Sequence, residues 1–193
     1  LDIINKNDVK IKSLVDLINK LKKDNEKNKI LVFSYFADTV DYLEKSLNKL
    51  CPDLNEENAV FLSSRKNQDK DDVVSRFSPK SQKYSFKDDE KEINYLISTD
   101  ILSEGQNLQD ASILINYDLH WNPVRMIQRN GRINRIGSKF EKVFVYNMKP
   151  EKNIEEKLNL VKRLEIKINL IKNTIGTDTP VLDEIENPIE YTD

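Results

Sequence analysis

Short apolar runs alternate with amphipathic stretches along most of this 193-residue chain. Apart from the basic residue that opens the last run, the runs are dominated by β-branched, aliphatic and aromatic residues, and they lie at 30–36, 59–62, 93–97, 112–116 and 142–148. Strands that alternate with helices predict a parallel sheet, because a parallel connection needs a crossover. The sequences ILVF and SILIN are nearly continuously apolar, which indicates a sheet covered on both faces. The expected fold is therefore a three-layer α/β/α domain with a mostly parallel central sheet.

Apolar residues at helical spacing predict the helices of this fold. We expect helices at 8–23, 38–50, 70–77 and 153–175, and a loop from the third helix through Glu92. The length suits one domain of ordinary size with appended segments. The expected organisation is an amphipathic leading helix and linker at 1–27, the α/β domain at 28–150, a long helix at 151–176 and an acidic tail at 177–193. Because the chain begins at Leu1, we expect it to be part of a longer protein.

Composition excludes several classes of site. Cys51 is the only cysteine and His120 the only histidine, so neither a disulfide framework nor a zinc site of the usual Cys/His kind can form, and we expect no metal site in this chain. No apolar run approaches the length that spans a bilayer, so we expect no membrane contact. The expected location is the cytosol of a bacterium.

Charge is unevenly distributed along the chain. The formal net charge of -2 does not by itself indicate a nucleic-acid binder. Residues 119–149, however, contain seven basic residues and one acidic residue, while 176–193 contain six acidic residues and no basic one. The central stretch is therefore the candidate anion-binding region.

The basic stretch centres on a helix with regularly spaced arginines. Asn122 and Pro123 suit the cap and first turn of a helix that contains QRNGRINR at 128–135. The arginines that line up along it are Arg125, Arg129, Arg132 and Arg135. Such a stripe is usually a solvated surface. Gly131 favours function instead, because a glycine inside a helix costs roughly 1 kcal/mol and suggests a close backbone approach or a helix end.

A second segment, STDILSEGQNLQD at 98–110, begins where a strand is expected to end. Ser98 and Thr99 offer neutral hydroxyl donors, which can hold a phosphate oxygen without reading a base. The alternative is a plain helix cap after a strand. Arginine suits phosphate chemistry nearby, because its planar fork stays charged and binds phosphate oxygens bidentately.

These segments resemble conserved motifs of superfamily 2 helicases and translocases. QRNGRINR is similar to motif VI, STDILSEGQNLQD to motif V, and ILVFSYF to the motif IV strand, with Tyr35 in place of the usual glutamine. WNP at 121–123 and Ile136-Gly137 resemble the Swi/Snf branch, and the segment 104–109 is closer to bacterial RapA-like motors or helicases fused to phospholipase-D-like nucleases. The resemblance covers roughly 28–150 and implies a RecA-like second lobe.

The resemblance also implies roles for individual residues. It assigns transition-state stabilisation or coupling at the ATP γ-phosphate to Arg132, Arg135 and Gln128. It places Gly105, Asn107 and Arg129 near the nucleotide. It assigns contact with the nucleic-acid backbone to Ser98, Thr99 and Ser34.

Half of the implied ATPase site is absent from this sequence. The four glycines, at 105, 131, 137 and 176, cannot form a GxxxxGK[ST] phosphate loop. The resemblance implies that ATP and Mg²⁺ are bound mainly by an N-terminal RecA-like lobe of the same polypeptide, so this fragment alone should be inactive. The expected whole is a motor that grips duplex DNA independently of sequence. An RNA helicase lobe and a non-catalytic nucleic-acid-binding module remain alternatives.

Overall fold

Twelve helices and strands form the described part of this chain in the computed structural model, which describes residues 8–25, 28–102, 105–134, 138, 140, 142–150 and 159–175. They are α2 (Val9–Asp24), β1 (Ile30–Ser34), α3 (Ala37–Leu50), β2 (Ala59–Leu62), α4 (Lys70–Phe77), α5 (Pro79–Gln82), β3 (Tyr95–Thr99), the 3₁₀ helix η1 (Asp100–Leu102), β4 (Ile113–Asn116), α6 (Pro123–Ile133), β5 (Phe144–Asn147) and α8 (Leu160–Ile175).

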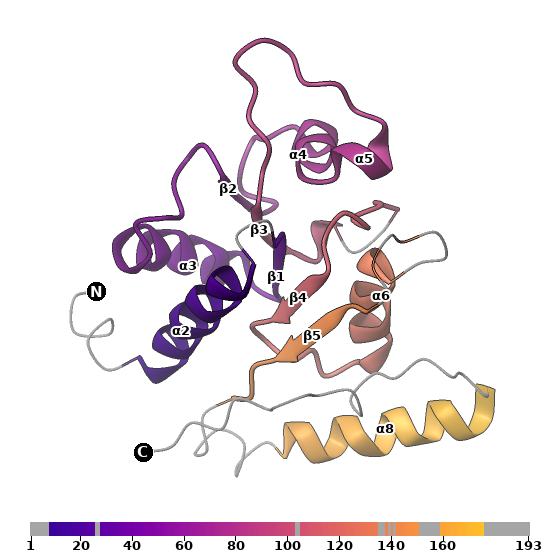
Figure 1. The fold of residues 1–193 in the computed structure, drawn as a ribbon. Helices are drawn as coiled ribbons and strands as arrows, with labels where there is room; N and C mark the ends of the chain where they lie inside the picture. Colours follow the sequence, from indigo (N-terminus) through magenta and orange to yellow (C-terminus); the bar gives the residue numbers. More distant parts are fainter. Residues whose placement is uncertain are drawn as a thin grey trace.

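The five strands form one parallel sheet in the order β2-β3-β1-β4-β5. All carboxyl ends therefore lie on one edge, and β1 sits in the middle with β3 and β4 on either side (Figure 1). After β1 the chain passes to the edge strand β2, returns to β3 between β2 and β1, and then crosses to β4 on the other side of β1. This reversal next to β1 is the place where open α/β sheets usually bind ligands.

Both faces of the sheet are covered, as the continuous apolar strands predict. Alternate β1 side chains enter different cores: Ile30 and Val32 pack with α2 and α3, whereas Leu31 and Phe33 pack with α4 and the end of α6. Figure 1 shows α2 and α3 together on one side of the sheet and α6 on the other. The three-layer α/β/α architecture is confirmed.

The short helix α5 and the position of β3 depart from the sequence-based expectation. Residues 79–82 were expected in a loop, but the buried carboxylate of Asp110 accepts hydrogen bonds from the backbone nitrogens of Lys80 (2.7 Å) and Ser81 (3.2 Å). This long-range cap satisfies donors that a four-residue helix cannot satisfy by itself. Strand β3 begins at Tyr95 rather than at 93 and continues to Thr99.

The carboxyl-terminal helix α8 packs on α6 through Met126, Leu164 and Ile168. It begins at Leu160, and residues 151–158 of the expected helix lie outside the described part of the chain, as does the acidic tail. Within the described residues no helix is long and apolar enough to cross a membrane. The same residues contain no cluster of three metal-ligating side chains.

Candidate nucleotide and nucleic-acid site

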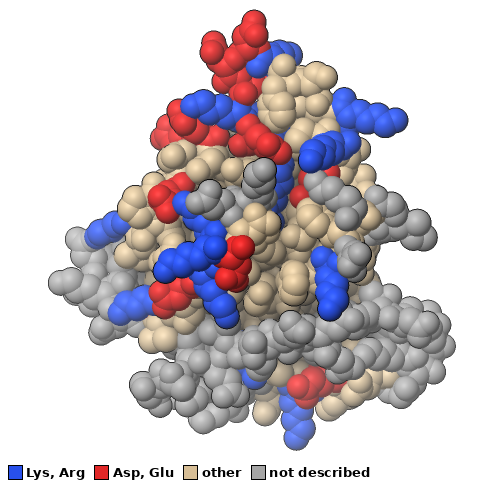
Figure 2. Space-filling model, in the orientation of Figure 1, with Lys and Arg blue, Asp and Glu red and all other residues tan. Residues whose placement is uncertain are grey.

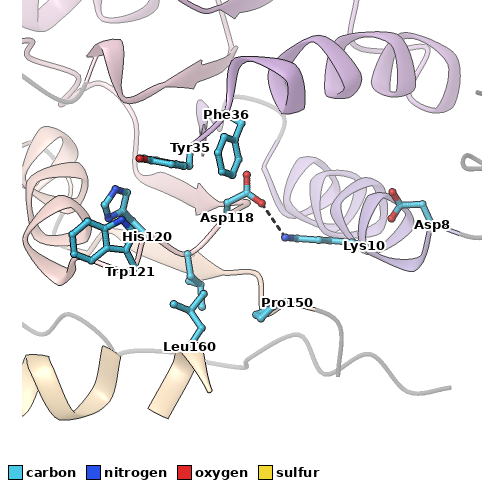
Figure 3. Close-up of a pocket in the computed structure, with 10 residues that line it drawn as sticks. Asp8, Lys10, Tyr35, Phe36, Asp118, His120, Trp121, Pro150 and Leu160 are labelled. Atoms are coloured by element: carbon cyan, nitrogen blue, oxygen red, sulfur yellow. Dashed lines mark hydrogen bonds and ion pairs between the residues drawn. The ribbon is translucent and has the colours of Figure 1, made fainter. Parts of the chain in front are cut away.

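The carboxyl edge of the sheet is hollowed by two open clefts that share Tyr35, His120 and Trp121. The first, here called the polar edge cleft, has a volume of about 640 Å³ and is lined at its polar side by Ser64, Thr99, Asp100 and Arg125. The second, the apolar edge cleft, has a volume of about 560 Å³ and reaches toward Lys10 and Leu160 (Figure 3).

The wall between the clefts is aromatic. Tyr35 meets His120 edge to face, with 4.6 Å between ring centroids, and His120 stacks on Trp121 at 5.5 Å. Trp121 is 60% exposed and Phe36 58% exposed, whereas His120 is buried. Burial lowers the pKa of His120, the nearby Asp100 carboxylate opposes this shift, and Arg129 adds to it. A lowered pKa keeps this imidazole neutral at physiological pH.

The start of α6 is set by local hydrogen bonds. Asn122 accepts from the backbone nitrogen of Val124 at 3.0 Å, and Pro123 occupies the first helical turn, as predicted. The His120 Nδ1 atom accepts from the backbone nitrogen of Asn122 at 2.9 Å. The turn that leads from β4 into α6 is therefore fixed at the edge where the clefts open.

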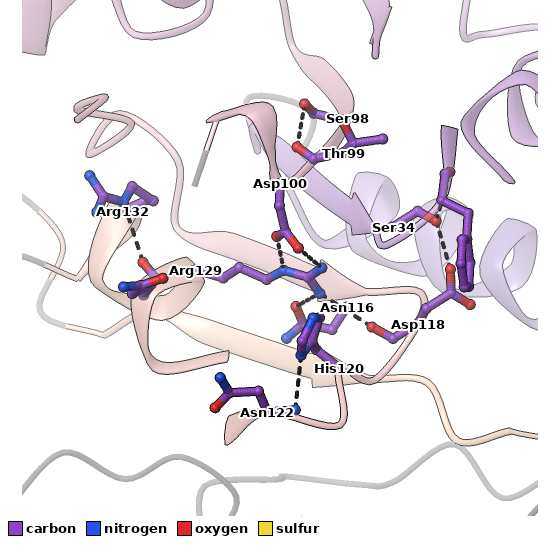
Figure 4. A network of polar contacts seen from close by, with 12 residues as sticks. Ser34, Ser98, Thr99, Asp100, Asn116, Asp118, His120, Asn122, Arg129 and Arg132 are labelled. Carbon is purple, nitrogen blue, oxygen red and sulfur yellow. Dashed lines mark hydrogen bonds and ion pairs between the residues drawn. The ribbon is translucent and has the colours of Figure 1, made fainter. Parts of the chain in front are cut away.

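Arg129 lies fully buried at the centre of a polar network (Figure 4). Its guanidinium group donates to both carboxylate oxygens of Asp100, from Nε at 2.6 Å and from Nη2 at 3.0 Å. Its Nη1 atom donates to the side chain of Asn116 (3.1 Å) and to the backbone oxygen of Asp118 (3.2 Å). The Phe33 ring centroid is 5.2 Å from the guanidinium carbon. Arg129 thus joins α6 to the ends of β3 and β4.

Asp118 belongs to a second network on the other side of the same edge. Its carboxylate accepts from the Ser34 hydroxyl at 2.6 Å (Figure 4) and from the Lys10 ammonium at 3.2 Å (Figure 3). Lys10 also lies 4.4 Å from the ring centroid of Tyr117. These contacts attach α2 to the carboxyl edge.

The residues expected to contact nucleic acid occupy different positions at this edge. Thr99 lines the polar edge cleft. Ser98 is fully buried and donates to the backbone oxygen of Thr99 at 2.8 Å. Ser34 is also fully buried, with its hydroxyl engaged by Asp118. In this conformation Thr99 alone of the three faces the cleft.

Two of the three residues expected near the nucleotide, Gly105 and Asn107, lie in the loop that follows η1. Gly105 is exposed and has φ +78°, a conformation that favours glycine. The Asn107 carboxamide accepts from the backbone nitrogen of Gln109 at 3.2 Å, and its backbone oxygen accepts from Gln82 at 3.1 Å. Arg129, by contrast, lies in the interior, where it joins structural elements.

The end of α6 is held directly against this loop. Arg132 donates from Nη1 to the backbone oxygen of Gln106 at 3.3 Å, and its own backbone oxygen accepts from Leu108 at 3.2 Å. The Gln128 Oε1 atom is buried and has no hydrogen-bond partner among the described residues. Arg135 lies outside the described residues.

Several polar residues of the site were not singled out from the sequence. Asp100, Asn116 and Asp118 each follow or end a strand, so their shared edge could have been anticipated. The buried positions Met126, Arg129, Asn130 and Ile133 recur at helical spacing, which was a signal that Arg129 faces the core. The face drawn in Figure 2 mixes Lys and Arg with Asp and Glu, so charge does not gather there into one basic patch.

Comparison with known proteins adds a family to this geometry. Residues 9–137 match the family described as helicase conserved C-terminal domain. The chain is 33% identical over 174 residues to the uncharacterized ATP-dependent helicase YqhH of Bacillus subtilis, and 28% identical over 188 residues to the ISWI chromatin-remodeling complex ATPase ISW1 of Saccharomyces cerevisiae. These matches cover 90% and 97% of this chain, but only 27% and 15% of the relatives.

Two solved structures share the fold. The C-terminal part of the Fun30 ATPase domain gives a TM-score of 0.60 at 23% identity, covering 80% of this chain and 44% of that one. Domain 2 of the DEAD-box helicase Mss116p, bound to an RNA duplex, gives a TM-score of 0.60 at 20% identity, covering 83% and 56%. The architecture is therefore that of a RecA-like helicase domain.

Proposed function

This chain belongs to the family of helicase conserved C-terminal domains, and we propose that it is the second lobe of a Swi/Snf-type ATP-dependent motor that translocates on duplex DNA. The observation that carries the proposal is the direct contact between α6 and the loop at 105–108, through Arg132, Gln106 and Leu108. These hydrogen bonds place an arginine of the motif VI segment beside the glycine loop of the motif V segment.

The chain's residues fit half of an ATPase site. Arg132 supplies a charge that does not titrate, in a planar fork suited to phosphate oxygens. Gly105 exposes backbone in a conformation that brings no side chain toward a ligand. By the resemblance to superfamily 2 motors, an N-terminal lobe of the same polypeptide would bind Mg²⁺ and most of ATP. Bound Mg·ATP would supply the phosphoryl group that is hydrolysed.

The proposed working cycle is closure and reopening of two lobes. In the closed state Arg132, and by resemblance Arg135, would reach across the interface and stabilise negative charge on the transferred phosphoryl group. Thr99 and the polar edge cleft would hold the backbone of one DNA strand without reading bases. Reopening after hydrolysis would shift this grip along the strand.

The proposal is tested by arginine substitutions in the complete polypeptide. We expect Arg132→Ala and Arg135→Ala each to lower DNA-stimulated ATP turnover by about 10³-fold, the low end of the usual effect of an arginine finger, with ATP binding retained. Arg163→Ala, on the exposed side of α8, is the matched control and should retain turnover.

Two other outcomes would favour the alternatives. Weaker DNA binding with an unchanged kcat in both arginine variants would indicate a non-catalytic nucleic-acid-binding module. Stronger stimulation by RNA than by duplex DNA would indicate an RNA helicase lobe, a class represented by a structural neighbour with the same TM-score as Fun30. Within the Swi/Snf-type motors, the sequence at 104–109 and Arg129 favour the branch of bacterial RapA-like motors or of helicases fused to phospholipase-D-like nucleases.

A further inference from the structure

The polar edge cleft has a carboxylate at its base. Asp100 lines this cleft together with Thr99, and its side chain is 18% exposed. A phosphodiester held by Thr99 would therefore lie close to a negative charge. Like charges at short range oppose binding, so the cleft can accept phosphate only if the Asp100 charge is compensated.

Arg129 provides that compensation from inside the protein. Its side chain is 0% exposed, so it cannot reach a ligand in the cleft. Its Nε and Nη2 atoms nevertheless donate hydrogen bonds to the two carboxylate oxygens of Asp100, at 2.6 and 3.0 Å. Its hydrogen bonds to the Asn116 side chain and to the backbone oxygen of Asp118 fix the guanidinium plane. The pair is therefore neutral, rigid and exposed only through Asp100.

The same arginine stands on the helix that carries Arg132. The two residues are three apart in α6, and Arg132 is held against the loop at Gln106. Because Arg129 is hydrogen-bonded to Asp100, a displacement of Asp100 would move Arg129 and therefore shift α6 relative to β3 and β4. The contacts thus connect the cleft mechanically to the end of α6.

We propose that Arg129 is a positioning residue that neutralises Asp100 at the base of the polar edge cleft, so that nucleic-acid phosphate can bind there, and couples this binding to the placement of Arg132. This inference rests on the proposed function. It separates two contributions of Arg129: its charge governs phosphate affinity, and its bidentate geometry governs turnover.

Single neutralising variants of the complete polypeptide test the charge contribution, with a fluorescently labelled DNA duplex as the probe and Kd measured without nucleotide. Arg129→Gln removes the positive charge that pairs with Asp100 and should weaken the Kd by about fivefold, whereas Asp100→Asn removes the negative charge at the cleft and should tighten it by about threefold. A purely structural role would shift both values in the same direction. That result, or no shift in either variant, would overturn the inference.

Two further variants keep the test decisive if a buried unpaired charge prevents folding. Arg129→Lys keeps the charge but not the fork, so the DNA Kd should stay within about twofold while DNA-stimulated kcat falls by about tenfold. The double variant Asp100→Asn/Arg129→Gln carries no unpaired charge and should give the same split. A Kd weakened in parallel with kcat in either variant would overturn the inference.

Arg132→Ala in the same assay separates this inference from the proposed function. Loss of stimulated hydrolysis in Arg132→Ala, combined with unchanged kcat in Arg129→Lys, would reject the coupling and leave the motor assignment standing. Unchanged hydrolysis in Arg132→Ala would reject the motor assignment itself.

Discussion

The Ser34 hydroxyl donates to the Asp118 carboxylate at 2.6 Å, across the junction between the ends of β1 and β4. Ser34 is fully buried, and the ammonium group of Lys10 contacts the same carboxylate from α2. Ser34 lies at a motif position that the family resemblance assigns to nucleic-acid contact. In this conformation its hydroxyl instead joins the ends of β1 and β4. Direct contact with DNA would require it to leave Asp118.

Ser34→Ala should therefore affect stability rather than binding. Loss of one hydrogen bond to a partly buried carboxylate should lower the free energy of unfolding by about 1 to 2 kcal/mol, measured by urea denaturation. The DNA Kd of the complete polypeptide should not change. Ser64→Ala is the matched control, because Ser64 is exposed and lines the polar edge cleft: it should weaken DNA binding and leave stability unchanged. A weaker DNA Kd with unchanged stability in Ser34→Ala would show that Ser34 contacts the DNA.

Lys167 of α8 should report how the carboxyl-terminal helix restrains the turn before α6. Its ammonium group donates to the backbone oxygen of Trp121 at 3.2 Å and lies 5.2 Å from the indole ring. Trp121 is the only tryptophan of the chain, so the tryptophan fluorescence of the isolated lobe comes from this residue alone. Lys167→Ala should increase acrylamide quenching of Trp121, whereas Lys162→Ala, exposed on the same helix, should not. Equal quenching in both variants would mean that the contact contributes nothing.

Local pattern was sufficient for most of the fold. The predicted apolar runs that begin at Ile30, Ala59 and Ser112 contain β1, β2 and β4. Helical spacing located α2, α3 and α4 closely, because their apolar residues face cores that the sheet itself creates. Helix α5 was missed because its cap, Asp110, lies about thirty residues further along the chain. Local propensity carries no information about such a partner.

The candidate site was less predictable for a similar reason. The arginines of α6 were interpreted as one ligand-facing stripe, but Arg129 shares the buried face with Met126 and Ile133. Its pairing with Asp100, 29 residues away, together with the hydrogen bonds to Asn116 and the backbone of Asp118, makes that burial tolerable. The role of a charged residue on an amphipathic helix thus depends on a partner that periodicity cannot identify.

His120 should make stability depend on pH in the weakly acidic range. Burial lowers its pKa in the folded state, so the unfolded chain, with a histidine pKa of about 6.5, binds a proton at higher pH than the folded chain does. The stability contribution is complete above that value and is lost as the pH falls below it. Urea unfolding at about pH 8 and about pH 5.5 should show a larger loss for the native chain than for His120→Gln. Equal losses would show that His120 does not titrate differently on folding.

The two described glycines of the motif segments should respond oppositely to alanine. Gly105 has φ +78°, where a side chain is strained even though an added Cβ would meet no atom within 4 Å, so Gly105→Ala should destabilise by about 1 kcal/mol. Gly131 lies inside α6, where an added Cβ again meets nothing within 4 Å among the described residues, so Gly131→Ala should stabilise by up to about 1 kcal/mol.

Glycine at position 131 therefore makes the lobe less stable than alanine would, and no described residue is close enough to exclude a Cβ atom there. If the proposed N-terminal lobe or its bound nucleotide approaches the helix at this point, Gly131→Ala should raise the unfolding midpoint of the isolated lobe while lowering DNA-stimulated turnover of the complete polypeptide. The matched control is Ser75→Ala, at a half-buried position in α4, away from the carboxyl edge, which should leave turnover unchanged. A more stable Gly131→Ala variant with full turnover would show that neither the proposed N-terminal lobe nor the nucleotide contacts α6 at position 131. The proposed role of Arg132 would not be affected.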